Sequence, residues 1–300
     1  MQRRHIAGYS LLCLIWGSTW LAIRVVVQTV PPLRAVTLRF ALAAALLALF
    51  IAMQRLPMPR HREMRGLLAL ALGMMALPYA LVFWAERLIP SSTTAVLFAS
   101  LPLFTALFTR LMSEGKVPRR AVYAMAVGAG GILVMFSGAL SASFATLMGG
   151  IAVLAAVALS AWATVFAKLK AAGVNPMVST AVQLGLGALL LMPACLLMER
   201  GEHAQWSHTA VAAMGFLIVF GSVVAFSVYY WLLREIEPYQ IATVQLVVPV
   251  VAIAEGALLG HERVPFSVLA AAALILGSVA VALRARANDE AMLSVRMGEL

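Results

Sequence analysis

The chain has 300 residues, of which 63% are hydrophobic and only 11% are charged, and its mean hydropathy is +0.96. Because a soluble domain carries about 25% charged residues, this composition excludes a water-soluble globular protein and indicates a polytopic membrane protein. The net charge of +10 does not indicate nucleic-acid binding, because the basic residues gather in short loops, where they set topology and contact anionic lipid.

Ten apolar runs are candidates for membrane-spanning helices, which need about 20 mostly apolar residues each. The separators between them are short and contain turn-forming residues such as Pro31-Pro32 and Asn175-Pro176, so no separate soluble domain is expected. The predicted fold class is therefore an all-α polytopic membrane protein with ten transmembrane helices. In chain order, the predicted spans are residues 7–27, 34–53, 66–86, 92–112, 121–138, 147–168, 177–198, 209–232, 241–259 and 266–283.

The distribution of basic residues predicts the orientation. With the N-terminus inside, 16 of the 22 Lys and Arg residues lie on the cytoplasmic side, as the positive-inside rule requires. Arg3 and Arg4 precede a first run that is long enough to be a retained helix and not a cleaved signal. The predicted location is the bacterial inner membrane, multi-pass, with both termini in the cytoplasm.

The two halves of the sequence are related by a shift of 146 or 147 residues. This shift places Trp16 on Trp162 and Pro102 on Pro249. The loop after the second span carries four arginines, whereas its counterpart in the second half carries one arginine and two acids. Opposite charge and an odd number of spans per copy both predict an inverted repeat. The predicted units are residues 1–143 and 144–286, each a five-helix repeat, followed by a flexible cytoplasmic tail at 287–300.

The ten-span pattern resembles the EamA-type branch of the drug/metabolite transporter superfamily over residues 7–284. The residues that carry this resemblance are Trp16-Gly17-Ser18, Arg39-Phe40, Pro102-Leu103-Phe104, Ser160-Ala161-Trp162-Ala163, Pro249 and Gly260-His261-Glu262-Arg263. The resemblance implies an exporter of amino acids or related small metabolites, with amino-acid exporters of the YddG type as the nearest functional group. In such inverted repeats the substrate lies near the midplane between the two halves and is moved by alternating access.

Candidate substrate-binding residues are the aromatic and polar side chains expected near the middle of their spans, because ligand sites combine apolar walls with a few polar groups. The alternative for each hydroxyl is a hydrogen bond to its own helix, and for aromatic rings near helix ends it is anchoring at the membrane interface. The candidates are Trp16, Ser18, Tyr79, Ser100, Trp162, Ser222, Phe226, Tyr230 and Gln245.

A second group of residues is predicted to act in gating. Pro102 and Pro249 are expected to bend their helices, either as hinges or as fixed bends. Arg39, Glu86 and Glu255 are charges expected toward the outer ends of spans, where an ion pair between Arg39 and Glu255 is the working hypothesis. A solvated or lipid-facing charge is the alternative for each.

Two other functions remain as alternatives. One is a proton-coupled multidrug or cation exporter of the same fold, with Glu86 and Glu255 as proton sites. The other is an intramembrane enzyme, which is disfavoured because His261-Glu262 lacks the second histidine of a metalloprotease motif. No cofactor or metal is expected, and the partners are a small-molecule substrate and membrane lipid. A monomer is expected, with Gly256 and Gly260 as the candidate dimer face.

Overall fold

The computed structural model describes residues 3–112, 123, 126–134, 143–170, 174–235 and 244–281, without the side chains of residues 167–170, 230, 233, 234 and 245. Within these residues the chain is helical and has no strand, which confirms the all-α class. The elements are α1 (Arg3–Val27), α2 (Pro32–Met53), α3 (His61–Leu70), η1 (Ala71–Ala76), α4 (Leu77–Ala85), α5 (Ser91–Phe98), α6 (Leu101–Met112), α8 (Phe144–Lys170), α9 (Pro176–Met198), α10 (His208–Ile218), η2 (Val219–Val224), α11 (Ala225–Glu235) and α13 (Val244–Leu258).

Seven helical segments in this described part are long and apolar enough to cross a membrane, and two shorter apolar helices follow at Leu246–Leu258 and Phe266–Val281. Their positions match nine of the predicted spans to within a few residues. Of the predicted span at 121–138, residue 123 and residues 126–134 are described, and they are helical. The rest of this span and the predicted tail at 287–300 lie outside the described residues. Continuous helix is the expected result, because the bilayer interior offers no water to satisfy backbone polar groups.

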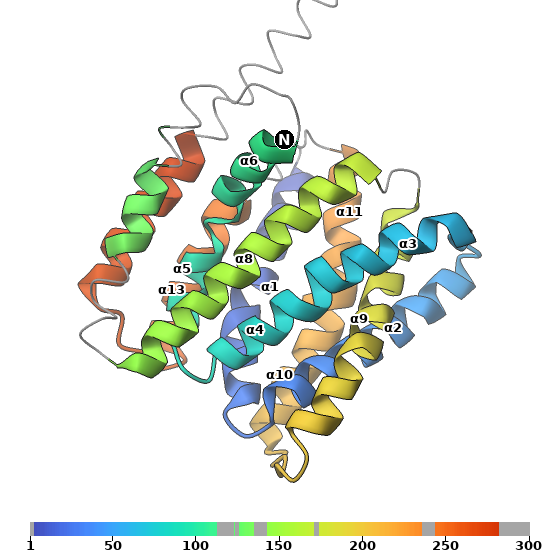
Figure 1. The fold of residues 1–300 in the computed structure, drawn as a ribbon, viewed down its shortest axis with the longest axis horizontal. Helices are drawn as coiled ribbons and strands as arrows, with labels where there is room; N and C mark the ends of the chain where they lie inside the picture. Colours follow the sequence, from blue (N-terminus) through green and yellow to red (C-terminus); the bar gives the residue numbers. More distant parts are fainter. Residues whose placement is uncertain are drawn as a thin grey trace, which may run out of the picture.

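The connecting segments 28–31, 86–90, 199–207 and 259–265 gather at one end of the bundle, along the lower edge of Figure 1. Hydrogen bonds join them there, including one from the Gln205 amide to the Thr29 carbonyl at 2.9 Å. We call this the capped end, for the helix caps described below. The predicted orientation places the capped end on the outer side of the membrane.

Three of the helical spans are irregular in the middle. The third span, His61–Ala85, contains the π-helical turn η1, and the eighth contains the π-helical turn η2, which starts 148 residues later. The fourth span is divided at Ala99 and Ser100 into α5 and α6. Such π-helical turns are often found at functional sites, and here they occur at corresponding places in the two predicted repeats.

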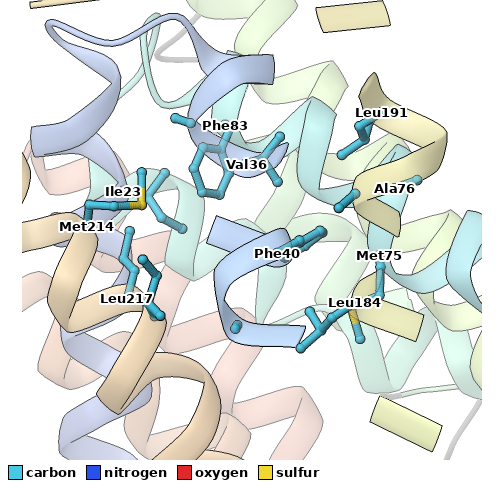
Figure 2. Packing of buried hydrophobic residues seen from close by; sticks show 14 of the residues in the cluster. Ile23, Val36, Phe40, Met75, Ala76, Phe83, Leu184, Leu191, Met214 and Leu217 are labelled. Atoms are coloured by element: carbon cyan, nitrogen blue, oxygen red, sulfur yellow. The ribbon is translucent and has the colours of Figure 1, made fainter. Parts of the chain in front are cut away.

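The largest group of buried apolar residues surrounds α2. Figure 2 shows Val36 and Phe40 of α2 between the side chains of α4, η1, α9 and α10. Phe40, Phe83 and Leu217 are almost completely buried in this group. Because α10 belongs to the second half of the chain and α2 to the first, this core joins the two halves.

A second contact between the halves is the crossing of α1 and α13. It depends on Gly17, because a Cβ atom at this position would lie 2.5 Å from the Cβ of Val251 and 3.3 Å from the carbonyl oxygen of Val248. Small residues let membrane helices approach closely enough for van der Waals contact to hold them together. The Trp16-Gly17-Ser18 segment therefore includes the contact point of two spans.

Candidate functional site

Glu262 caps the first turn of α5 at the capped end. Its two carboxylate oxygens accept hydrogen bonds from the amides of Ser91 and Ser92 at 2.8 and 3.1 Å, and from their hydroxyls at 2.7 and 2.8 Å. The N-cap of α5 is Pro90, which supplies no side-chain hydrogen bond, so a carboxylate from far along the chain satisfies these amides. A carboxylate is favoured at a helix N-terminus because the helix dipole is positive there.

The charge of Glu262 is stable at neutral pH. Burial alone would raise the pKa of its carboxyl group, but the hydrogen bonds from Ser91 and Ser92 outweigh burial and lower the pKa below the ordinary value. The ordinary pKa of a glutamate, which applies to the unfolded chain, is about 4.3. Because the pKa is lower in the folded protein, the carboxylate of Glu262 contributes fully to folding stability above that pH. This contribution is lost only as the pH falls through the lowered pKa. Glu262 therefore stays ionised in the physiological range.

Glu199 makes an equivalent cap on α2. Its carboxylate oxygens accept hydrogen bonds from the Leu33 amide at 2.6 Å and the Arg34 amide at 2.8 Å. The residue before α2 is Pro31, again without a side-chain cap. The Arg34 guanidinium in turn donates to the backbone carbonyls of Glu199 at 3.2 Å and Glu202 at 3.1 Å. Both caps therefore connect a loop of the second half to a helix of the first half at the capped end.

Arg24 and Glu86 lie next to the Glu262 cap. The Arg24 guanidinium approaches the Glu262 carboxylate at 3.4 Å and donates to the backbone carbonyls of Glu86, at 2.8 Å, and Ile89. The Glu86 side chain is completely buried, and neither of its carboxylate oxygens has a hydrogen-bond partner in the described part of the chain. The structure thus places the predicted gating residue Glu86 at the closure, although its own carboxylate makes none of these bonds.

Aromatic rings from both halves meet beside the centre of α1. Trp16 lies 6.1 Å from Phe226 in an edge-to-face arrangement and 5.5 Å from Tyr229, measured between ring centroids. All three rings are partly exposed. Trp16 and Phe226 are predicted substrate-binding residues, and the fold brings them together from α1 and α11. Tyr229 was missed by the sequence argument, which named its neighbour Tyr230; the side chain of Tyr230 lies outside the described residues.

Tyr79 contacts Arg39 and not the Trp16 group. The Arg39 guanidinium carbon lies 5.5 Å from the centroid of the Tyr79 ring, and Phe40 packs edge-on against the same ring at 5.0 Å. The hypothesis of an Arg39–Glu255 ion pair finds no support in these contacts. Glu255 instead lies 2.8 Å from the Ser18 hydroxyl. The reason is that Arg39 turns toward α4, whereas Glu255 of α13 faces α1.

The hydroxyl groups among the candidates are largely engaged with their own helices. Ser100 donates to the Leu97 carbonyl at 2.6 Å, and Ser222 donates to the Leu217 carbonyl at 3.0 Å. The Ser222 bond spans five residues and closes the widened turn of η2. The Ser18 hydroxyl can donate either to Glu255 or to the Leu14 carbonyl at 2.7 Å. Substrate binding by these hydroxyls would require exchange of these bonds, so their role remains a prediction.

The two predicted hinge prolines have different surroundings. Pro249 lies inside the continuous helix α13, as expected. Pro102 does not bend a continuous helix, because α5 ends at Phe98 and Pro102 is the second residue of α6. A proline costs no backbone hydrogen bond in the first turn of a helix. The interruption at Ala99–Ser100, and not a kink at Pro102, is therefore the irregularity of the fourth span.

The remaining candidates are placed as follows. Trp162 stacks on Phe166 of the same helix, with 5.4 Å between centroids, and would lie 3.2 Å from a Cβ added to Gly73 in η1. The side chain of Gln245 lies outside the described residues. Gly256 and Gly260 do not form one helix face, because α13 ends at Leu258. A Cβ on Gly256 would lie 2.6 Å from the Glu262 carboxylate, so this glycine makes room for the cap.

The caps made by Glu199 and Glu262 were not predicted. Their signal in the sequence was indirect: a proline immediately before α2 or α5 leaves the first amides of the helix without a local side-chain cap. Glu262 also belongs to the Gly260-His261-Glu262-Arg263 segment that carried the family resemblance. Within the described residues, no group of three or more His, Cys, Asp or Glu side chains is placed to hold a metal ion.

Comparison with known proteins gives a family match over nearly the whole chain. The model of the EamA-like transporter family matches residues 6–137 and again residues 147–284. The uncharacterized inner membrane transporter YedA of Escherichia coli K12 is 31% identical over 253 residues, which are 84% of this chain and 81% of that protein. The uncharacterized transporter YoaV of Bacillus subtilis is 27% identical over 89% of this chain and 92% of its own length.

Two further comparisons extend this result. A protein of Salmonella typhimurium named as a probable amino-acid metabolite efflux pump is 24% identical over 93% of this chain and 94% of its own length. A solved crystal structure superposes with a TM-score of 0.61, covers 94% of this chain and 97% of that chain, and is 19% identical in sequence. At this identity the structural match supports the fold alone.

Proposed function

We propose a substrate and a transport cycle for this chain from the premise that it belongs to the EamA-like transporter family, within the drug/metabolite transporter superfamily. It is a membrane transporter and not an enzyme. The proposed function is secondary export of amino acids or related small metabolites across the bacterial inner membrane. The relative named as an amino-acid metabolite efflux pump supports this substrate class.

The observation that carries the proposal is the meeting of aromatic residues from both halves at Trp16, Phe226 and Tyr229. In transporters built from inverted repeats, the substrate lies where the repeats meet. Partly exposed aromatic rings offer contact area to apolar side chains and to cations. The two separate family matches and the corresponding turns η1 and η2 support the proposed repeat.

We propose alternating access with the capped end closed in this structure. Two buried carboxylates, Glu199 and Glu262, close that end. At the opposite end, Glu235 pairs with Arg4 at 2.9 Å, but the Arg4 side chain is 61% exposed. An exposed ion pair contributes little, about 0–1 kcal/mol, whereas each helix cap contributes about 0.5–2 kcal/mol. Among the described residues, the two caps are thus the stronger of these contacts, and we propose that export requires both caps to open.

A proton-coupled cation exporter is the second candidate function, and one observation favours it. Glu86 is a completely buried carboxylate without a hydrogen-bond partner among the described residues. Buried ionisable groups in transporters commonly carry protons or bind cations. Dependence of transport on a pH gradient, and its loss in Glu86→Gln, would select this function over gradient-independent amino-acid export.

We expect purified protein in liposomes to take up amino acids in a saturable manner that does not depend on an imposed pH gradient. The panel would contain labelled neutral, aromatic, basic and acidic amino acids and a quaternary ammonium ion. Trp16→Ala and Phe226→Ala should each reduce uptake by about tenfold, because each removes from the proposed site a ring with about 1–2 kcal/mol of contact. Trp84→Ala is the control, since Trp84 is 42% exposed.

The results separate the two candidate functions. Movement of the quaternary ion alone, driven by the pH gradient, would contradict amino-acid export and support the cation exporter. Equal uptake by wild type, Trp16→Ala and Phe226→Ala would contradict the proposed position of the site. Size-exclusion chromatography of each variant in detergent would establish that a loss of uptake is not a loss of folding.

A further inference from the structure

Arg39 is a buried cation without an anionic partner in the described part of the chain. Its exposure is only 4%, and its Nε and Nη1 atoms have no hydrogen-bond partner among the residues that the structure describes. It lies seven residues into α2, well inside the span, so the side chain is not at a helix end from which it could reach water. An arginine in this position is unusual, because charged side chains within membrane helices normally pair with each other or with backbone carbonyls.

The surroundings of Arg39 come from several helices and from both halves of the chain. The guanidinium carbon lies 5.5 Å from the ring centroid of Tyr79 and 6.0 Å from that of Phe83, both on α4. A Cβ atom added to Gly221, in η2 of the second half, would lie 3.5 Å from Nη2 of Arg39 and 3.0 Å from Thr19 of α1. Arg39 therefore sits at the junction of the two halves, against the π-helical turn η2.

These contacts compensate the buried charge only in part. Cation–π contacts with two rings return less free energy than the removal of a guanidinium from water costs. Hydrogen bonds to the unpaired N–H groups would offset the remaining desolvation cost. An anion would offset more of this cost than a neutral acceptor, because it also interacts with the charge. From this we infer that Arg39 binds the carboxylate of the transported substrate. The inference rests on the proposed function, because it names the group of the protein that binds the carboxylate of a transported amino acid.

The charges near this position favour a carboxylate over a phosphate. A phosphate dianion would need more than one cation, and Arg39 is the cation at this junction among the described residues. Arg24 and Arg34 make their own bonds at the capped end. A single guanidinium can bind a carboxylate through two parallel N–H bonds. Tyr79 and Phe83 then serve to hold the guanidinium plane and to exclude water from the pair.

The test compares ligands that differ only at the carboxylate. The best-transported amino acid of the liposome panel would compete with itself, with its amide and with its decarboxylated amine. On the wild type, we expect the amide and the amine to compete about 10- to 100-fold less well than the acid. Arg39→Gln should lose this preference, and Arg39→Lys should keep part of it, because lysine retains the charge but not the parallel pair of donors.

Arg87→Gln is the matched control, because Arg87 is an exposed arginine at the capped end whose side chain is 46% accessible. It should retain both uptake and the preference for the acid. Equal competition by acid and amide on the wild type would overturn the inference without any variant. An Arg39→Gln protein with wild-type KM and wild-type preference would also overturn it.

A binding measurement keeps this result separate from the fate of the proposed function. Thermal stabilisation of the detergent-solubilised protein by phenylalanine, phenylacetate and phenylalanine amide reports binding without transport. Stabilisation by the two carboxylates but not by the amide, lost in Arg39→Gln, would support the inference even if no amino acid is transported. Stabilisation by none of the three, or equally by all, would contradict it.

Discussion

Glu262→Ala is expected to open the capped end. The substitution removes the acceptor of four hydrogen bonds from Ser91 and Ser92 and the carboxylate that faces Arg24. Loss of a helix cap costs about 0.5–2 kcal/mol, and a charge left without its buried partner adds to this cost. The population open at this end should therefore rise by about tenfold or more.

The measurement is the reaction rate of a cysteine introduced at Thr94 with a membrane-impermeant maleimide on intact cells. Thr94 is completely buried in α5, one turn below the cap. Cys13 and Cys195 would first be replaced by serine, so that only the reporter reacts. We expect slow labelling of the Thr94→Cys protein that retains Glu262. Labelling should be at least about tenfold faster in the same protein with Glu262→Ala. Glu262→Gln should fall between them, because it keeps one acceptor oxygen.

Glu202→Ala is the control for this prediction. Glu202 also lies at the capped end, but it forms an exposed pair with Arg87 at 3.7 Å, and such pairs contribute little. Unchanged labelling in Glu262→Ala would contradict the role of the cap. Labelling only in inside-out vesicles would show that the capped end is cytoplasmic and that the predicted orientation is wrong. Because Glu262 stays ionised at neutral pH, the wild-type labelling rate relative to that of a freely exposed cysteine at the same pH should not change between pH of about 6 and 8. The ratio removes the pH dependence of the thiolate itself.

Gly17→Ala is expected to destabilise the protein by separating α1 from α13. The added methyl group would lie 2.5 Å from the Cβ of Val251 and 3.3 Å from the Val248 carbonyl oxygen. Neither neighbour can move without its helix, because both atoms belong to or adjoin the backbone. Overpacking of this kind costs about 1–3 kcal/mol, which corresponds to a decrease in melting temperature of about 5 °C for a chain of this size. Transport should fall as well, since α1 also carries Trp16.

Gly215→Ala is the matched control, because Gly215 is an exposed helical glycine with no atom within 4 Å of the added Cβ. Its melting temperature should be unchanged or slightly higher, since alanine favours helix over glycine. The double variant Gly17→Ala/Val251→Gly should recover part of the lost stability, because glycine removes the Cβ of residue 251 with which the added methyl group would clash. A Gly17→Ala protein that melts and transports like wild type would show that the α1–α13 contact is looser than described.

The sequence alone was sufficient to predict the class of protein and the positions of its spans. The predicted spans at 7–27, 34–53 and 177–198 correspond to helices that begin and end within a few residues of them. The prediction of spans succeeds because the bilayer imposes a local requirement. Each membrane-spanning segment must be a continuous apolar run with its backbone hydrogen bonds satisfied within the helix. The match to the EamA-like family covers residues 6–137 and 147–284, which include all ten predicted spans apart from residue 138.

The details of the candidate site were harder to predict. Trp16 and Phe226, both predicted from the sequence, meet in the structure, whereas the predicted pair Arg39 and Glu255 contact different helices. Pro102 was predicted to bend its helix, whereas the helix is interrupted before this residue at Ala99–Ser100. The π-helical turns η1 and η2 have no local signal, because they arise from how neighbouring helices pack.

Only the tertiary structure decided which groups become partners across the two halves. The caps of α5 by Glu262 and of α2 by Glu199 join residues that are more than 160 positions apart. The unpaired guanidinium of Arg39 is likewise defined by what α4 and η2 place around it. Hydropathy depends on each residue and its neighbours in the chain, so the sequence determines where helices form. Pairing depends on the rotation and depth of every helix, and these are set by the packing of the complete bundle.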